Sequence, residues 1–474
     1  MIMIKKQNEH NPVMTQRYGA DPYALVYNDT VYLYMTADTY MYFSDGTIRE
    51  NNYSNINTIN VISSKDLVNW TDHGSVHAAG PAGAAPWGGN SWAPAAAYKN
   101  IDGKDKFFLY FANSGNGIAV LTSDSPVGPF VDAINGPLVS RQTPNCADVT
   151  WLFDPAVLMD DDGNAYIYFG GGCSREQKVD NPGTARVAKL GQDMISLDGD
   201  PIRIENVSYL FEDSGINKIN GKYVYSYCSN FSVPQEKEAE LGFGNGEIIT
   251  MTSDDPMGPF TFNRSILKNP QFYFGRGGNN HHCMFEFKGQ LYMSYHTRIL
   301  EEALDVNAGY RSTNIDKVVL GADGNIEMIQ GTRTGVEQVV PFNPYEKVKA
   351  VTFAWMEGAD TVAYGETSQK CGSGDMILTK ITSGAFTGLA GVDFADKNAK
   401  EIVMAVRGKA KEACAVSVRI DSLDGEEIAN VKLANLTADF SEVSAALTKE
   451  VSGVHDLFFV FEGEGYEVNY WMFK

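Results

Sequence analysis

The feature that most limits the fold of this chain is a hairpin pattern that occurs five times within residues 1–340. Each copy is a tight turn followed by a strand rich in aromatic residues, such as Val31-Tyr32-Leu33-Tyr34. The turns are residues 28–29, 102–103, 162–163, 220–221 and 288–289. Because turn residues that accept a positive φ followed by an alternating strand are typical of β-hairpins, we expect five hairpins.

The spacing of the hairpins indicates how they assemble. Successive turns lie roughly 60 to 70 residues apart, which is room for one four-stranded blade of a propeller. A second repeat agrees, because Ser-Asp-x-Pro-x-Gly-Pro-Phe occurs at residues 123–130 and again at 253–260. The sequence therefore predicts an all-β protein built on a five-bladed β-propeller. The alternative is an irregular two-sheet protein with similar hairpins.

The blade pattern stops near Pro341 and Pro344, and shorter alternating segments follow, such as residues 401–406, 415–420 and 456–461. These segments favour a small β-sandwich. The predicted organisation is a propeller domain at residues 1–344 followed by a β-sandwich at residues 345–474.

Composition limits the partners and the location. A formal net charge of −21, spread along the chain, argues against nucleic acid and anionic membrane surfaces as partners. A short apolar start is followed by Lys5 and Lys6, the reverse of a secretory signal, so we expect a cytoplasmic protein. The six cysteines form no Cys-x-x-Cys pair, which favours free thiols over a disulfide framework or a zinc site.

Chemically distinctive residues occur at similar positions in all five repeats. They lie roughly 8 to 11 residues before each hairpin turn, at the start of the strand expected to be innermost in its blade. The five residues are Asp21, Trp92, Asp154, Glu212 and His281. Because innermost strands surround the propeller axis, we expect these side chains to meet at one mouth of it.

Three carboxylates in one aromatic-walled funnel suit the cleavage of a glycosidic bond. That reaction needs one protonated acid to assist the leaving oxygen and one carboxylate to act on water or carbon. Crowding raises the pKa of at least one acid and keeps a proton available near neutral pH. The alternative for any single acid is that it caps a turn or pairs with a basic residue.

The first 340 residues resemble glycoside hydrolase family 43, whose members are five-bladed propeller hydrolases acting on arabinose- and xylose-containing polysaccharides. The resemblance rests on several short motifs, which are Gly19-Ala20-Asp21-Pro22, Ser63 to Trp70, Ser91-Trp92-Ala93-Pro94, Phe153-Asp154-Pro155, Phe211-Glu212, Asn279-Asn280-His281-His282 and Tyr295-His296-Thr297-Arg298. It implies that Asp21 is the general base, Glu212 the general acid and Asp154 the residue that tunes and orients the acid. Inversion of configuration follows from these roles.

Binding roles for three further residues can also be considered, namely for His281, Arg298 and Trp92. His281 matches a position that often supports a hydrated calcium ion on the axis, although a His that only hydrogen-bonds in the core is the alternative. Arg298 matches a position that often contacts the sugar, with a surface arginine as the alternative, and Trp92 could stack on a sugar face or pack in a blade. Asp213 follows the acid where a small residue is common, and on a strand it would point away from Glu212. No organic cofactor is implied.

Residues 345–474 resemble carbohydrate-binding module family 6, in Gly391-Val392-Asp393-Phe394 and in Gly453 to Phe461. The sequence departs from that family by having Phe386 and Leu389 where Trp and Tyr are usual. Because sugar stacking needs an aromatic platform, we expect a structural or substrate-shaping domain more than an independent glycan binder.

The function predicted from these observations is that of an exo-acting, inverting α-L-arabinofuranosidase. It would remove arabinose side groups from arabinoxylan- or arabinan-derived oligosaccharides, and we expect it to act as a monomer. A β-xylosidase acting on xylo-oligosaccharides would need the same three acids. A non-catalytic propeller lectin is disfavoured because a lectin for neutral sugars has no need of a proton donor.

Overall fold

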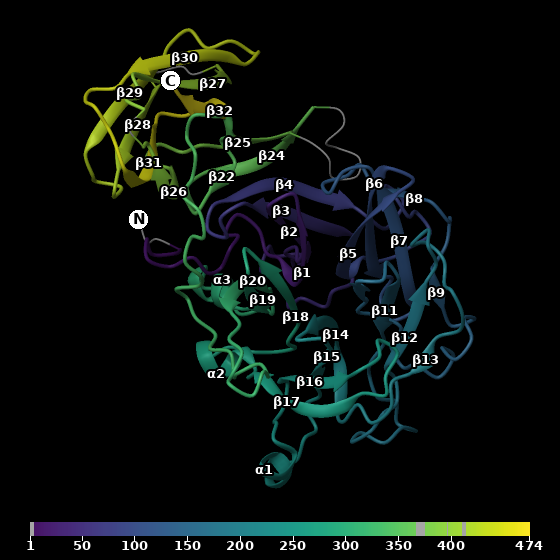
Figure 1. Ribbon diagram of the computed structural model, residues 1–474. Coiled ribbons are helices and arrows are strands. Elements are labelled where there is room, and N and C mark those ends of the chain that lie inside the picture. Colours follow the sequence, from purple (N-terminus) through teal and green to yellow (C-terminus); the bar gives the residue numbers. More distant parts are fainter. Residues whose placement is uncertain (1–3, 366–374, 396, 410–413) are drawn as a thin grey trace.

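Five antiparallel sheets, each built around one of the predicted hairpins, are arranged in a ring in the computed structural model of the protein (Figure 1). The structure describes residues 4–365, 375–395, 397–409 and 414–474. The predicted all-β, five-bladed propeller followed by a β-sandwich is confirmed. Within the described residues, no helix is long and apolar enough to cross a membrane.

The hairpin turns have the backbone conformation that their residues predicted. Asn28 and Asp29 have φ values of 47° and 55°, and the glycine of each other turn also has a positive φ. In every blade the hairpin joins the innermost strand to the second strand. The blades consist of β1 (Ala20–Tyr27), β2 (Thr30–Thr36), β3 (Thr58–Ser64) and β4 (Trp70–His77); β5 (Trp92–Ile101), β6 (Lys104–Ala112), β7 (Gly117–Ser123), β8 (Val131–Asp132) and β9 (Val139–Ser140); β10 (Ala156–Met159), β11 (Ala165–Phe169), β12 (Arg186–Leu190) and β13 (Ile202–Arg203); β14 (Leu210–Ile219), β15 (Lys222–Ser229), β16 (Ile248–Ser253) and β17 (Thr261–Leu267); and β18 (His282–Phe287), β19 (Gln290–Thr297) and β20 (Ser312–Lys317).

The segment that precedes blade 1 closes the ring by lying along the last strand of blade 5. The backbone N–H of Val13 donates to the carbonyl of Thr313, at 2.9 Å, and the N–H of Gly19 donates to that of Arg311, at 3.0 Å. The side chain of Asn11 accepts from the N–H of Ile315 at 2.8 Å. The seam between the first and last blades is therefore hydrogen-bonded along its length.

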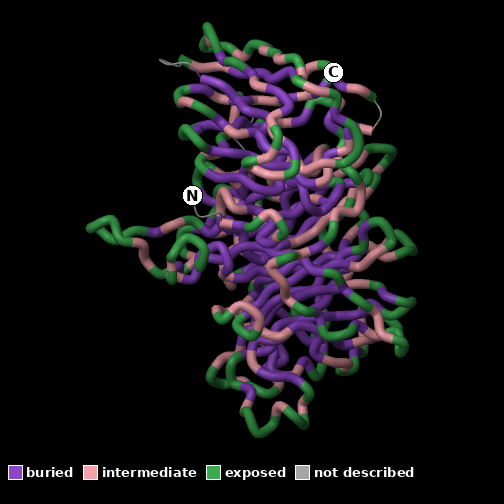
Figure 2. Tube along the Cα trace, turned by 90° about the vertical axis from the view of Figure 1, so that its left-hand side faces the viewer, coloured by how far each residue is buried: buried purple, intermediate pink, exposed green. Residues whose placement is uncertain are grey.

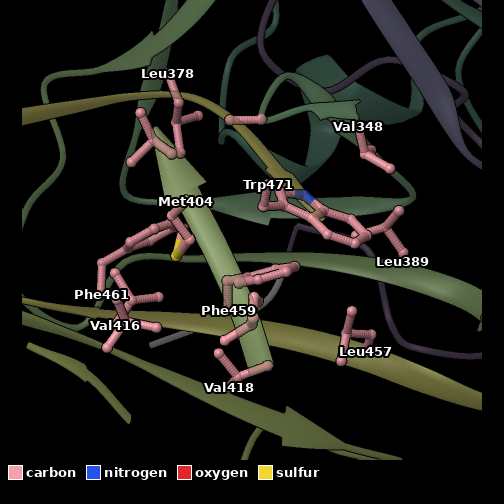
Figure 3. Packing of buried hydrophobic residues seen from close by; sticks show 14 of the residues in the cluster. Val348, Leu378, Leu389, Met404, Val416, Val418, Leu457, Phe459, Phe461 and Trp471 are labelled. Carbon is pink, nitrogen blue, oxygen red and sulfur yellow. The ribbon is translucent and has the colours of Figure 1, made fainter. Parts of the chain in front are cut away.

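Two facing sheets form the carboxyl-terminal domain, as predicted. One contains β24 (Asp360–Tyr364), β25 (Asp375–Thr379), β32 (Tyr466–Phe473), β27 (Glu401–Gly408) and β30 (Ser441–Ala446), with β21 (Val348–Lys349) paired to β32; the other contains β23 (Trp355–Glu357), β26 (Phe386–Asp393), β31 (Val454–Glu462), β28 (Cys414–Ile420) and β29 (Glu427–Leu433). Figure 3 shows side chains such as Met404, Phe459 and Trp471 packing between the sheets. Figure 2 shows buried positions running through both lobes of the molecule, with exposed positions gathered in the connecting loops.

Helices are few and short among the described residues, and they connect strands of the propeller. They are the 3-10 helix η1 (Gln235–Lys237), α1 (Glu238–Leu241), α2 (Pro270–Phe274) and α3 (Ile299–Ala303). The cores are therefore made almost entirely by strand side chains.

The boundary predicted between residues 344 and 345 falls within a segment that serves both domains. On its near side, the N–H of Phe342 already donates to the carbonyl of Gly391 in the sandwich. On its far side, β22 (Thr352–Phe353) adds a fifth strand to blade 1 by pairing with β4. Asn69 of the propeller exchanges two hydrogen bonds with the backbone of Ala390, at 2.8 and 2.9 Å. The two domains therefore share an edge.

Deletion of residues 345–474 is expected to destabilise the propeller, because it uncovers the side chain of Val68, which is 1% exposed and packs with Trp355 and Phe458, and the edge of β4 that pairs with β22. Loss of their burial should lower the melting temperature by about 5 °C or more, or cause aggregation. In the full chain, Asn69→Ala should lower stability by about 1–3 kcal/mol, because the N–H of Ala390 loses its partner and the carbonyl of Ala390 keeps only the bond from Gln338. Differential scanning calorimetry checks both changes.

The matched control is Asn52→Ala, since the Asn52 side chain is exposed and bonds only to nearby Ser54. Its effect should stay within about 0.5 kcal/mol. A truncated propeller that melts at the temperature of the full chain would show that the shared edge is dispensable.

Candidate active site

Backbone irregularities at the starts of the innermost strands turn polar side chains toward the axis. The strand pairing shifts register between Ala20 and Tyr23, between Trp92 and Ala95, and between Glu212 and Gly215. Such bulges re-aim a side chain and end regular pairing. The backbone takes positive φ values at four equivalent positions, three beside these breaks and one just before β10, which are Asp21 (46°), Ala93 (41°), Asp213 (69°) and Asp154 (51°).

A small pocket of about 90 Å³ lies at this mouth of the axis. All five residues that the repeat placed there line it. The complete lining is Asp21, Tyr53, Trp92, Ala93, Phe153, Asp154, Glu212, Asn279, His281 and Arg311. The indole of Trp92 is held in the wall by a hydrogen bond from Nε1 to the carbonyl of Tyr53, at 3.0 Å.

Asp21 lies beside a buried arginine. Arg311 donates from Nη1 to Oδ1 of Asp21 at 2.8 Å, and it makes a fork of two 2.9 Å hydrogen bonds to Asp38. His296 Nδ1 lies 3.0 Å from the same oxygen of Asp21. Burial opposes ionisation, but Arg311 and His296 outweigh it and hold the pKa of Asp21 well below its usual range. Asp21 is therefore ionised over the working pH range.

Glu212 and Asp154 have the opposite tendency. Burial, followed by the negative charges of Asp154 and Asp21, raises the pKa of Glu212 well above its usual value. Burial and the charge of Asp21 likewise raise the pKa of Asp154, although its Oδ2 accepts a hydrogen bond from the N–H of Asp213 at 2.9 Å. Oε1 of Glu212 is buried and has no hydrogen-bond partner among the described residues. Glu212 is thus arranged to carry a proton and to give it to a ligand.

His281 lies between the carboxylates. Its Nδ1 is 3.7 Å from Oδ1 of Asp21 and from Oδ2 of Asp154, and its Nε2 is 3.2 Å from Oδ1 of Asp213. Burial lowers the pKa of the imidazole, which favours the neutral ring.

This environment does not fit a calcium ion bound directly by His281. Both ring nitrogens face carboxylates, and calcium prefers a shell of oxygen ligands. The described residues contain no group of three or more His, Cys, Asp or Glu side chains that could hold a metal ion. A hydrated ion on the axis stays a prediction, and no step below runs through a metal.

The arginine that lines the pocket is Arg311, whereas the sequence motifs indicate Arg298. Arg298 precedes α3 and is absent from the pocket lining; its guanidinium lies close to Gly278 and Gly309 instead. Arg311 lies just before β20, an outer strand of blade 5, so counting back from hairpin turns does not sample it. Tyr53 lies in the long connection between β2 and β3, and its ring contacts the Arg311 guanidinium at 4.8 Å. No sequence pattern marked either residue.

A five-bladed propeller with three buried acids in one axial pocket, only one of them beside an arginine, has the arrangement that glycosidic-bond cleavage requires. Residues 9–326 match the model of glycosyl hydrolases family 43, and residues 349–474 match carbohydrate binding module family 6. The chain belongs to glycoside hydrolase family 43, which confirms the resemblance seen in its motifs.

Similar proteins cover nearly the whole chain. It is 45% identical to an arabinoxylan arabinofuranohydrolase of Paenibacillus polymyxa, over 98% of this chain and 73% of that protein. It is 44% identical to an arabinoxylan arabinofuranohydrolase of Bacillus subtilis, over 99% of this chain and 93% of that protein. A crystal structure of a family 43 arabinoxylan arabinofuranohydrolase from Bacillus subtilis in complex with cellotetraose superposes with a TM-score of 0.93 at 43% identity, covering 100% of this chain and 99% of that one.

Replacing Arg311 with Met should move the acid limb of the pH–activity profile upward. Without the guanidinium, burial is no longer outweighed, so the pKa of Asp21 rises and the ionised base is lost at a higher pH. A shift of at least about one pH unit in kcat/KM is expected, the size typical of losing an adjacent opposite charge.

The control is Arg17→Met, which removes another arginine–aspartate pair outside the pocket, between part-buried Arg17 and buried Asp72 at 2.6 Å. It should lower stability and leave the acid limb in place. An unchanged acid limb in the Arg311 variant would show that Asp21 does not set it.

Proposed function

We propose that the protein is an exo-acting α-L-arabinofuranosidase that removes arabinose side groups from arabinoxylan-derived oligosaccharides with inversion of configuration. The observation that carries this proposal is the placement, in one small pocket, of Asp21 against the Arg311 guanidinium and of buried Glu212, whose Oε1 has no hydrogen-bond partner among the described residues. The two relatives named as arabinoxylan arabinofuranohydrolases support the substrate. The small pocket suits a single terminal sugar better than a threaded chain.

The reaction uses the two carboxyl groups in different protonation states. Asp21, ionised beside Arg311, removes a proton from water as the water attacks the anomeric carbon. Glu212 donates its proton to the departing oxygen as the glycosidic bond breaks. Asp154 lies beside the acid, and negative charge on Asp154 or Asp21 raises the pKa of Glu212 further and favours its protonated form.

The carboxyl-terminal domain has a structural or substrate-shaping role in this proposal. Phe386 and Leu389 are 3% and 0% exposed and pack in the interior, so neither side chain is available as a stacking platform. The protein acts as a monomer, and it acts in the cytoplasm on small oligosaccharides.

Incubation with an arabinose-substituted xylo-oligosaccharide should release arabinose and leave an intact xylose backbone. Proton NMR should show the sugar first released with the opposite anomeric configuration, because water attacks from the side facing away from the leaving group. Asp21→Asn should abolish the release. Shortening of unsubstituted xylo-oligosaccharides with no arabinose release would favour a β-xylosidase, and retention of configuration would refute Asp21 as the base.

Glu212→Gln and Asp21→Asn should differ in their dependence on the leaving group. A nitrophenolate leaves almost unaided, so Glu212→Gln should lose roughly 100-fold or more in kcat on the natural oligosaccharide and much less on a nitrophenyl arabinoside. Asp21→Asn should impair both substrates alike, and Asp154→Asn should lie between the two. Equal losses on both substrates for Glu212→Gln would show that another group donates the proton.

A further inference from the structure

Asp213 follows the acid Glu212 in the sequence, where the pairing of β14 shifts register. Its side chain is absent from the pocket lining and is completely buried, with 0% exposure. Its φ of 69° is a conformation that non-glycine residues adopt rarely, so the surrounding contacts must hold it there.

Those contacts reach both neighbours of the acid. The N–H of Asp213 donates to Oδ2 of Asp154 at 2.9 Å. Oδ1 of Asp213 lies 3.2 Å from Nε2 of His281, the ring that stands between Asp21 and Asp154. One residue therefore touches Asp154 through its backbone and His281 through its side chain.

A second histidine anchors the carboxylate from behind. Oδ2 of Asp213 lies 2.5 Å from Nδ1 of His282, and Oδ1 accepts a hydrogen bond from the N–H of His282 at 3.2 Å. Nε2 of His282 is in turn 2.8 Å from Oγ of Ser226. The result is a continuous buried chain from Ser226 through His282 and Asp213 to His281 at the floor of the pocket.

The order Ser226, His282, Asp213 is that of a hydrolytic triad, but this one cannot act as a nucleophilic site. Ser226 is 0% exposed, and a Cβ built on Gly215 would lie 2.4 Å from its Oγ. No substrate carbon can approach such an oxygen. These buried contacts therefore serve to hold the four side chains in place.

The carboxylate of Asp213 has no lysine or arginine partner among the described residues, because its ion-pair contacts are both histidines. Burying a carboxylate without a cation is costly unless each oxygen is hydrogen-bonded. An asparagine at this position would place an NH₂ group where one of the two carboxylate oxygens faces a histidine ring, so it could not present an acceptor to both rings in this geometry.

We propose that Asp213 is a positioning residue for the acid side of the reaction. By fixing His281 and the backbone N–H that binds Asp154, it holds Asp154 at the distance from which Asp154 keeps Glu212 protonated and oriented. The inference rests on the proposed function. It predicts that Asp213 and Asp154 act as one unit.

The test is a double-mutant cycle of Asp213→Asn and Asp154→Asn, measured on an arabinose-substituted xylo-oligosaccharide and on a nitrophenyl arabinoside. Asp213→Asn should lower kcat on the oligosaccharide by about 10- to 100-fold, the range expected for misplacing a reacting group by about 1 Å or less. KM should change by less than about twofold, and the loss on the nitrophenyl arabinoside should be smaller. The double variant should be no slower than Asp154→Asn alone, because the two residues act through the same step.

The matched control is Asp316→Asn, which changes another buried aspartate that is outside the pocket and accepts from Tyr295 and Thr332. It should lower the melting temperature, leave kcat near that of the unchanged protein, and combine multiplicatively with Asp154→Asn. If Asp213→Asn does not fold, His282→Gln takes its place in the double-mutant cycle with Asp154→Asn. This variant keeps a donor near Oδ2 of Asp213 but changes the histidine that anchors it.

Two outcomes would overturn the inference while leaving the proposed function intact. One is a normal kcat in a folded Asp213→Asn protein, and the other is a loss that multiplies with that of Asp154→Asn. An Asp154→Asn protein with normal kcat would instead refute the role assigned to Asp154 under the proposed function. It would also refute the inference that Asp213 acts through Asp154.

Discussion

Closure of the five blades into a ring is the constraint on which the pocket depends. The segment before β1 is hydrogen-bonded to β20, and the last of these bonds joins Gly19 to the carbonyl of Arg311. Asp21 follows Gly19 by two residues. The hydrogen bonds that close the ring therefore also place Asp21 against the Arg311 guanidinium. An ion pair that unites the beginning and the end of the propeller is therefore also the pair that keeps the base ionised.

The proposed chemistry depends on a difference in electrostatic surroundings among the three acids of one small pocket. All three acids are almost completely buried, and burial alone would raise the pKa of each. Only Asp21 has a buried cation beside it, so only its pKa is lowered, and its negative charge then raises those of Asp154 and Glu212. The charge of Arg311 thus favours the ionised form of Asp21 as a base, whereas Glu212 favours the protonated form as an acid.

Much of this arrangement could be predicted from the sequence because it is encoded locally. Turn chemistry and strand alternation depend on neighbouring residues, and repetition of the hairpin fixed both the number of blades and the positions that converge, including Asp21, Asp154 and Glu212. Arg311 and Tyr53 could not be found in this way, since each reaches the pocket from an irregular position in the chain. Strand alternation predicted that Asp213 would point away from Glu212, but alternation cannot reveal which groups a buried side chain contacts.

The edge shared by the two domains has a consequence for how such a protein is assembled. Blade 1 carries Asp21 on its innermost strand and receives β22, from the far side of the predicted boundary, on its outermost strand. The sandwich therefore supports the blade that supplies the base through direct strand pairing, rather than being a separate domain joined only by a linker. Exchanging it for an unrelated binding domain at residue 345 would leave the outer edge of β4 without its hydrogen-bonded neighbour. In this architecture the unit that can be recombined intact is the propeller together with its sandwich.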